Sequence, residues 1–411
     1  MQGLVTERLG RPVHPHEVAS EPPIVGIFIQ HYPPQLGGAE CQAKILATRL
    51  VDLGCRVELM TTRHRSDLPP WTSMGLLTIR RFPTVSPRWL KLPFNLVSGF
   101  VAGLLIARKI DLVHAHCLSP FVLGALFAAK LHRLPVILKI CTIGEKGDIA
   151  KVHRVGFNRL LWRIYQRADC FVANTAAVQD ELIAEGTPSS RVFKIHNMLE
   201  EYPGERCLGD KPRLRRTLGL EDKLTVLYVG RLHPDKGLLL LMQHWPEIAR
   251  RYDAQLVLVG EGPLRAELEA WRSVGSLQAA VTLTGYQPDP TPYYRSADIF
   301  VFPSVSEAFG NAILEAMSHG LAVVTTRVGI VCEWGDDAPL AIMATDEPDN
   351  LPQLLGQLLE DECRRTNLGS RAALFVRGRF DSRVICHEYI AQYQRMLGRA
   401  GAPPGSEMQD N

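Results

Sequence analysis

Two glutamates lie eight positions apart in the stretch VFPSVSEAFGNAILEAMSHG, residues 301–320, on either side of a predicted helix start. A strand-like run stops at Pro303, a polar turn follows, and helical spacing begins near Asn311, a residue type that suits the N-cap. Glu307 would then lie on the loop before the helix, and Glu315 about one turn inside it. Free N–H groups at this helix start can bind a phosphate, while the carboxylates can accept hydrogen bonds from hydroxyl groups. The simpler interpretation is that the acidic residues only compensate the helix dipole.

Two cations bracket a short loop in YVGRLHPDKG, residues 228–237. The preceding strand ends at Gly230, Arg231 and Lys236 follow, and a leucine-rich helix comes next. In open α/β sheets ligands bind beyond the carboxyl ends of the strands, and two cations before a helix N-terminus suit a diphosphate. The alternative is a pair of solvated loop cations.

Two glycines, Gly37 and Gly38, follow the first predicted strand and directly precede the first predicted helix. Backbone N–H groups can approach an anion closely at glycines because no Cβ atom is in the way. The G-x-G-x-x-G pattern of a dinucleotide site is absent from this position, and a tight turn without a ligand is the alternative.

Two histidines, His114 and His116, lie two residues apart in DLVHAHC, so a strand would project both to one face. One of them could donate a hydrogen bond to an oxyanion or a sugar hydroxyl at the carboxyl end of that strand. A buried, hydrogen-bonded histidine is the simpler alternative. Metal binding is the third, although the sequence supplies no obvious further ligands.

The elements that must position these residues are predicted by alternating apolar runs and helix-length segments. Strands buried on both faces of a parallel sheet are apolar nearly throughout. The predicted strands are 24–29, 57–62, 76–82, 112–116, 135–140, 170–174, 192–197, 224–230, 254–260, 281–285, 298–304, 321–326 and 340–344. Two successive arrays of this kind predict an α/β protein with two doubly wound domains and a ligand in a cleft between them.

Proline, glycine and charge without periodicity around residues 201–212 indicate a linker between the two domains. We predict five segments on this basis: a disordered N-terminal segment over 1–22, an N-terminal domain over 23–202, a linker over 203–212, a C-terminal domain over 213–383, and a disordered tail over 399–411. A helical pattern over 384–398 would follow the second domain.

Composition narrows the function classes. With 411 residues, 46% apolar and 22% charged, the chain can bury sizeable cores, and a formal net charge of +3 does not favour nucleic acid as a partner. The nine cysteines form no C-x-x-C pair and predict a reduced setting with mostly buried thiols. No signal-like apolar region begins the chain, and the apolar run 95–107 is shorter than the roughly 20 residues of a membrane span. We expect a cytoplasmic protein and leave open a peripheral contact with the inner face of the membrane.

The combination of GRLHPDKG with PSVSEAFGNAILEAMSHGLAVVTT closely resembles the donor-binding half of retaining glycosyltransferases of family 4. The GGAE loop and DLVHAH stand in the order expected of that family, and the resemblance covers residues 24–398. It implies the GT-B fold, in which two Rossmann-like domains face each other across a cleft. It also implies transfer of a sugar, with retention, from a nucleoside-diphosphate sugar (UDP or GDP) to a hydroxyl of a glycan, lipid-linked or small-molecule acceptor.

The resemblance implies roles for the residues on the nucleotide side. Arg231 and Lys236 would neutralise the donor diphosphate, and Gly38 would bring its N–H to the phosphate from the N-terminal domain. Glu315 would bind the ribose. No cofactor and no metal are expected, and the absence of a D-x-D motif agrees with positive side chains at the diphosphate.

The resemblance also implies roles on the sugar side. Glu307, with the backbone around Phe309, Gly310 and Asn311, would hold the transferred sugar. His116 matches the histidine that contacts the sugar near the reacting carbon, so His116 and Glu307 are the candidate catalytic residues. His114 would support the strand, and the helix 384–398 would pack back onto the N-terminal domain.

The acceptor side departs from the family pattern in KICTIGEKGDIA, residues 139–150. Glu145 and Asp148 are candidate contacts to sugar or acceptor, with a solvated loop as the alternative. Basic and aromatic residues also gather between 63 and 94, which would suit an anionic lipid or a phosphorylated acceptor. They are Arg63, Arg65, Arg80, Arg81, Arg88 and Lys91, with Trp71, Trp89 and Phe94 among them.

Two alternative functions fit the same architecture. A nucleotide-sugar epimerase would need the same donor residues, and a non-catalytic protein could bind the sugar nucleotide alone. An NAD-dependent oxidoreductase is disfavoured because its glycine pattern is missing after the first strand.

Overall fold

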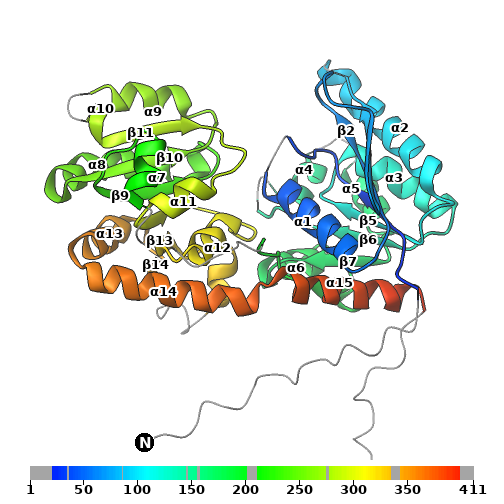
Figure 1. Cartoon of the computed structure of the whole chain (residues 1–411). Coiled ribbons are helices and arrows are strands. Elements are labelled where there is room, and N and C mark those ends of the chain that lie inside the picture. The colour runs from blue at the N-terminus through cyan, green and yellow to red at the C-terminus, as the bar shows by residue number, and fades with distance from the viewer. Residues whose placement is uncertain are drawn as a thin grey trace, which may run out of the picture.

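The computed structural model describes residues 21–34, 37–85, 87–144, 147–154, 158–200, 211–274, 277–334 and 343–398. Two α/β domains stand side by side, each built around its own sheet (Figure 1). The first sheet has the order β3-β4-β2-β1-β5-β6-β7-β8 and the second β11-β10-β9-β12-β13-β14. Every strand pair is parallel except the antiparallel pair β3–β4. This is the α/β GT-B architecture that the sequence predicts.

The strands of the first sheet are β1 (Val25–Phe28), β2 (Val57–Arg63), β3 (Trp71–Met74), β4 (Leu77–Pro83), β5 (Leu112–His116), β6 (Val136–Lys139), β7 (Cys170–Ala173) and β8 (Val192–Lys194). Those of the second are β9 (Leu224–Val229), β10 (Ala254–Val259), β11 (Val281–Gly285), β12 (Ile299–Phe302), β13 (Ala322–Thr326) and β14 (Met343–Thr345). Central strands such as β1, β5 and β12 are buried along their whole length, which is why they read as continuous apolar runs.

Helices cover both faces of each sheet. In the N-terminal domain they are α1 (Gly38–Asp52), α2 (Arg88–Ile106), α3 (Pro120–Leu131), α4 (Asp148–His153), α5 (Asn158–Tyr165) and α6 (Ala176–Ala184). In the C-terminal domain they are α7 (Lys211–Thr217), α8 (Leu238–Tyr252), α9 (Arg265–Arg272), α10 (Leu277–Ala280), α11 (Thr291–Ser296), α12 (Asn311–Ser318), α13 (Leu351–Glu360) and α14 (Glu362–Arg379), and α15 (Ser382–Met396) follows. Within the described residues, none is long and apolar enough to cross a membrane.

The order of the strands reverses direction at one point in each sheet. β1 lies between β2 and β5, and β9 lies between β10 and β12. At such a point the two neighbouring connections leave in opposite directions, so the carboxyl ends of the central strands border an open space that ligands use. The residues predicted to bind the donor come after β1, β9 and β12, and His116 ends β5, so all of them belong to strands at these two switch points.

Three predictions about the fold are wrong. The predicted strands do not include β3, a short exposed edge strand joined to β4 by a turn with Gly75 at φ +60°. Its residues face solvent and therefore carry no alternating apolar pattern. The thiols are not mostly buried, since only Cys55, Cys170 and Cys386 are buried among the eight described cysteines. Residues 1–20 of the predicted disordered segment 1–22, the tail 399–411 and residues 203–210 of the predicted linker lie outside the described residues, and the linker prediction is wrong at its end because α7 begins at Lys211.

The last helix ties the two domains together. After α14, the chain passes Phe380, whose carbonyl accepts a hydrogen bond of 2.9 Å from the N–H of Leu199. Helix α15 then packs against α1 beneath the N-terminal domain (Figure 1). On the sheet side, a 2.6 Å hydrogen bond joins the Tyr393 hydroxyl to Nδ1 of His114, and Nζ of Lys139 donates to the Tyr389 hydroxyl at 2.9 Å.

We predict that Tyr393→Phe destabilises the protein by about 1–3 kcal/mol, because it leaves the buried Nδ1 of His114 without its partner. The matched control is Tyr252→Phe, which removes an exposed hydrogen bond to Glu360 and should cost less than about 0.5 kcal/mol. Chemical denaturation followed by intrinsic fluorescence compares the two variants. Equal losses of stability would show that the contact of α15 with the sheet is not a source of stability.

Candidate active site

The structure brings the predicted donor residues together at the carboxyl ends of the switch-point strands. Gly38 opens α1 just beyond β1, and Asn311 opens α12 beyond β12. The side-chain amide of Asn311 donates to the carbonyl of Gly38 at 3.4 Å. Its oxygen accepts from Nδ2 of Asn197 at 2.9 Å. The residues predicted to hold the phosphate and the sugar therefore meet across the two domains.

Lys236 and Glu307 form an ion pair at the centre of the donor side. Both side chains are largely buried, and Ser304 Oγ donates a second hydrogen bond of 3.0 Å to the same carboxylate oxygen. Gly237, at φ +67°, lets the loop after β9 touch the loop after β12, because a Cβ atom there would collide with the carbonyl of Pro303. The positions of the ammonium and the carboxylate are thus set by contact between two backbones.

Arg231 lies at the mouth of the same loop and is exposed. Its carbonyl accepts a 2.9 Å hydrogen bond from the buried Tyr228 hydroxyl, which anchors the backbone while the guanidinium faces outward. The positive charge of Arg231 also reaches Glu40 on α1 in the other domain, where it acts to lower the pKa of that carboxyl against the larger, opposing effect of burial.

Glu315 lies in the middle of α12 and is half-buried. The Tyr294 hydroxyl donates to its Oε2 at 2.9 Å. Burial raises the pKa of Glu315, and the hydrogen bond from Tyr294 opposes that rise. A partly desolvated carboxyl with a fixed orientation is suited to accept hydrogen bonds from a pair of hydroxyls.

The N-cap assignment of Asn311 is wrong. Gly310 occupies the cap position of α12 with φ +91°, a left-handed conformation that favours glycine. Asn311 is the first helical residue, and its side chain spans the domain boundary instead of capping the helix. The side chain of Phe309 is buried beside Phe380 and His196, so only the backbone of Phe309 could face a sugar.

The two histidines of β5 are stacked, with ring centroids 4.6 Å apart. His114 is bonded to Tyr393, whereas neither ring nitrogen of His116 has a hydrogen bond within the described residues. Burial lowers the pKa of His114 to about 3 and that of His116 well below its usual range, so both imidazoles are neutral. His116 is therefore the histidine with free donor and acceptor capacity.

Further buried polar atoms without partners lie along the same edge of the first sheet, among the described residues. They belong to Gln30 and His31 after β1, His64 after β2, and Asn174 after β7. Buried polar groups are nearly always hydrogen-bonded, so a row of exceptions at the carboxyl ends of the strands indicates a surface for a polar ligand. None of these residues was predicted as a site residue, although all four lie at or within two residues of the end of a predicted strand.

Lys139 is another residue that the sequence analysis missed. It lies in β6 beside His116, is only 1% exposed, and is bonded to Tyr389 of α15. Burial lowers the pKa of this lysine to about 8. A lysine inside the apolar run VILKI was the available signal.

The acceptor-side candidates have different outcomes. Glu145 lies outside the described residues. Asp148 is buried at the start of α4, and its Oδ2 accepts from the N–H groups of Cys141 at 3.0 Å and Thr142 at 3.2 Å. Asp148 thus shapes the loop after β6, and its contact with sugar or acceptor stays a prediction.

A second carboxylate joins the domains away from the donor residues. Glu333, in the short 3-10 helix Gly329–Glu333, accepts from the N–H of Ala176, from Lys194 Nζ at 2.9 Å and from His196 Nε2 at 3.4 Å. Burial alone would raise the pKa of Glu333, but these hydrogen bonds outweigh it and lower the pKa to about 2. Glu333 therefore holds the C-terminal domain against α6 and β8.

Comparison with known families agrees with this geometry. Residues 36–200 match the family model described as Glycosyltransferase Family 4, and residues 223–361 match the one described as Glycosyl transferases group 1. The chain belongs to glycosyltransferase family 4.

Two relatives of this glycosyltransferase are similar to it over nearly their whole length. A glycosyltransferase of Methanocaldococcus jannaschii is 28% identical over 91% of the chain and 100% of the relative. The N-acetylgalactosamine-N,N'-diacetylbacillosaminyl-diphospho-undecaprenol 4-alpha-N-acetylgalactosaminyltransferase of Campylobacter jejuni is 27% identical over 85% and 93%. The structure of Anabaena HepE in complex with UDP-glucose has a TM-score of 0.71 at 20% identity, covering 91% of this chain and 99% of that one. This likeness shows the shared fold.

The interdomain carboxylate gives a pH prediction. Because the pKa of Glu333 in the folded protein lies below its usual 4.5, its contribution to stability is complete above about pH 5 and is lost as the pH falls from 4.5 towards 2. We expect Glu333→Gln to be less stable than the unsubstituted protein at pH 7, with the difference shrinking below pH 4.5.

Unfolding midpoints measured between pH 7 and pH 3 test this, with the exposed Glu247→Gln on α8 as the matched control. A difference between Glu333→Gln and the unsubstituted protein that stays constant with pH would contradict the role of the Glu333 charge.

Proposed function

We propose that this glycosyltransferase moves a sugar from a nucleoside-diphosphate sugar, UDP or GDP, to an acceptor hydroxyl, with retention at the anomeric carbon and without a metal at the diphosphate. The observation that carries the proposal is the buried Lys236–Glu307 pair, which the fold places between Arg231 and the start of α12. A cation and a helix N-terminus can bind the diphosphate of such a donor, and a carboxylate can accept hydrogen bonds from its sugar hydroxyls.

On the donor side, Lys236 and Arg231 supply the positive charge for the diphosphate, and the first N–H groups of α12 add the partial charge of the helix dipole. Such groups stabilise the leaving diphosphate more strongly in a partly dry site than in water, which is the work a divalent ion does in other transferases. Glu315 would bind the ribose hydroxyls. The HepE structure with UDP-glucose, a protein of the same fold, supports a nucleotide-sugar donor.

On the sugar side, Glu307 would accept from sugar hydroxyls while it stays paired with Lys236. The neutral imidazole of His116, with both nitrogens unbonded, would contact the sugar near the reacting carbon. The acceptor would attack from the face that the diphosphate leaves, and a phosphate oxygen would take the acceptor's proton. This route forms no covalent sugar–enzyme bond and therefore needs no carboxylate nucleophile.

For the acceptor, we propose a lipid-linked glycan reached from a membrane surface on the cytoplasmic side. Helix α2 buries one face on α3, where Gly99 and Gly124 let the two helices approach until a Cβ atom would collide with the opposite backbone. Its other face leaves large apolar side chains exposed at helical spacing: Leu90, Phe94, Val97, Val101 and Leu104. The C. jejuni relative is named for a diphospho-undecaprenol acceptor, which supports this choice.

Charge on and beside α2 suits an anionic bilayer. The helix contains no acidic residue, and the exposed cations Lys91, Arg108 and Lys109 lie near its two ends. By contrast, some of the cations that the sequence pointed to have partners within the protein, since Arg65 pairs with Asp67 and Arg80 with Glu58. An apolar stripe bordered by cations is the pattern of a helix that lies in the membrane interface.

We expect Lys236→Ala and Glu315→Ala to weaken binding of the nucleotide donor by about 10–100-fold, because each removes a charged hydrogen-bonding group. His116→Ala should leave donor binding within a few-fold and lower kcat by about 10²-fold or more. Calorimetric titration with the nucleoside diphosphate and steady-state transfer assays separate the two effects. Arg250→Ala, an exposed cation on α8, is the control that should change neither.

Full activity in the Lys236, Glu315 and His116 variants would refute the proposed donor site. Product analysis separates the rival functions: a new nucleotide sugar formed without an acceptor indicates an epimerase, and binding without any product indicates a non-catalytic protein.

We expect Val97→Asp and Val101→Asp each to weaken binding to vesicles with anionic phospholipid by at least about tenfold, because a buried charge opposes insertion of the apolar stripe. Transfer to a water-soluble acceptor should be unchanged. Leu374→Asp, at a 74% exposed leucine on α14, is the matched control. Vesicle co-sedimentation that does not distinguish the three variants would contradict the membrane contact.

A further inference from the structure

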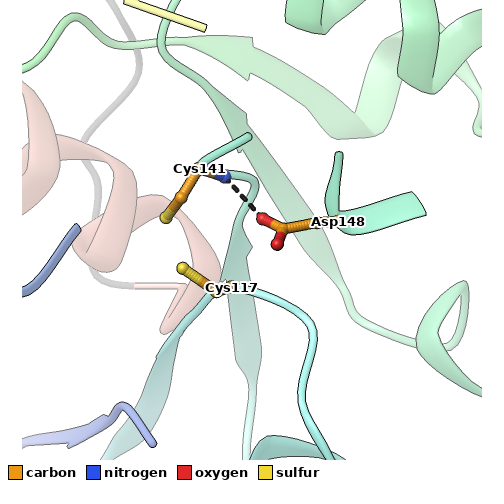
Figure 2. Close-up of side chains that lie close together, drawn as sticks. All are labelled: Cys117, Cys141 and Asp148. Atoms are coloured by element: carbon orange, nitrogen blue, oxygen red, sulfur yellow. Dashed lines mark hydrogen bonds between the residues drawn. The ribbon is translucent and has the colours of Figure 1, made fainter. Parts of the chain in front are cut away.

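Three side chains with metal-binding atoms converge at the carboxyl ends of β5 and β6, next to His116. They are Cys117, Cys141 and Asp148, and one ligand atom of each lies within 4.8 Å of the other two. Figure 2 shows the two thiols facing each other, with the carboxylate beside them. Cys117 follows β5, Cys141 follows β6, and Asp148 begins α4.

The backbone around the cluster is held by several independent contacts. Cys117 has φ +63°, an unusual conformation for a residue other than glycine, and its N–H donates to the carbonyl of Lys139 at 2.9 Å. Oδ2 of Asp148 accepts the N–H groups of Cys141 and Thr142. A left-handed cysteine costs about 1 kcal/mol or more, and such strain collects at functional sites.

The donor set is one that favours a borderline-soft divalent cation. Thiolate sulfur with carboxylate oxygen selects zinc over magnesium or calcium, which prefer oxygen ligands only. A tetrahedral zinc ion about 2.3 Å from each sulfur would place the two sulfurs about 3.7 Å apart. Since the ligand atoms lie within 4.8 Å of one another, the two sulfurs need to approach by about 1 Å at most. The hydrogen bonds to Asp148 are of the kind that orient a ligating carboxylate.

We propose that Cys117, Cys141 and Asp148 bind a zinc ion through three protein ligands, with the fourth position open to water or a ligand. The site lies on the acceptor side of His116 and is separate from Lys236 and Arg231, so the proposal does not rest on the donor assignment. A disulfide between the two thiols is the competing use of the pair, but it would give Asp148 no part.

Cobalt(II) tests the proposal as a spectroscopic substitute for zinc in the reduced, full-length protein. We expect one equivalent of cobalt to produce the intense visible bands of a tetrahedral site and a thiolate-to-cobalt charge-transfer band in the near ultraviolet. Zinc should abolish both sets of bands. Cys117→Ser and Cys141→Ser should each reduce the charge-transfer band and weaken zinc binding by at least about tenfold, and Asp148→Asn should weaken zinc binding while keeping the band.

Two exposed cysteines outside the cluster provide the control, since Cys332→Ser and Cys363→Ser should bind cobalt as the unsubstituted protein does. Circular dichroism of each variant checks its folding, and the cobalt spectrum of the unsubstituted protein stands without any variant. Absence of a thiolate–cobalt band would overturn the proposal. So would a Cys117–Cys141 disulfide, found by mass spectrometry, in a protein that binds no cobalt after reduction.

Discussion

A largely buried ammonium group needs a counter-charge, and the pairing of Lys236 with Glu307 is the constraint around which the donor side is arranged. Lys236 stands on the loop after β9 and Glu307 on the loop after β12, so the pair joins the two central strands of the second sheet. Gly237 permits the contact between these loops, and Ser304 fixes the carboxylate. In the free enzyme the pair avoids an isolated buried charge. Under the proposed function, the same ammonium would face the donor diphosphate.

Lys236 and Glu307 both belong to the C-terminal domain. A second set of contacts holds the N-terminal domain against this part of the C-terminal domain. Asn311 bonds to Gly38 and Asn197, Thr175 Oγ1 donates to the carbonyl of Ala308 at 3.0 Å, and Glu333 reaches α6 and β8. Apolar packing follows the same path, because one buried cluster runs from the first sheet through Met198, Leu199 and Phe380 into the second. Helix α15 then links the segment around Phe380, where the two domains meet, to His114, and His116 is stacked on His114. The position of His116 relative to the donor loops therefore depends on the join between the domains.

The sequence could predict those features of the structure that depend only on a local pattern of residues. Both sheets followed from apolar runs, and the donor residues from their places after such runs. Three features could not be predicted because their causes are not local. The edge strand β3 is exposed and has no apolar face. Gly310, in a left-handed conformation, occupies the N-cap position of α12 that was predicted for Asn311. Lys139 is buried and bonded to Tyr389 of α15, a residue 250 positions further along the chain.

Charge is divided between the two sides of His116. On the C-terminal side, the exposed Arg231 makes the approach positive, because Lys236 is balanced by Glu307, whereas the carboxyl of Asp148 lies beside two thiols on the other side. The exposed Arg231 therefore favours a donor bound with its phosphates over the C-terminal domain. Under the two proposals made above, positive side chains would serve the diphosphate while a zinc ion would lie on the acceptor side. A metal on the acceptor side would not replace the cations at the phosphate; it would act on the groups that border the acceptor.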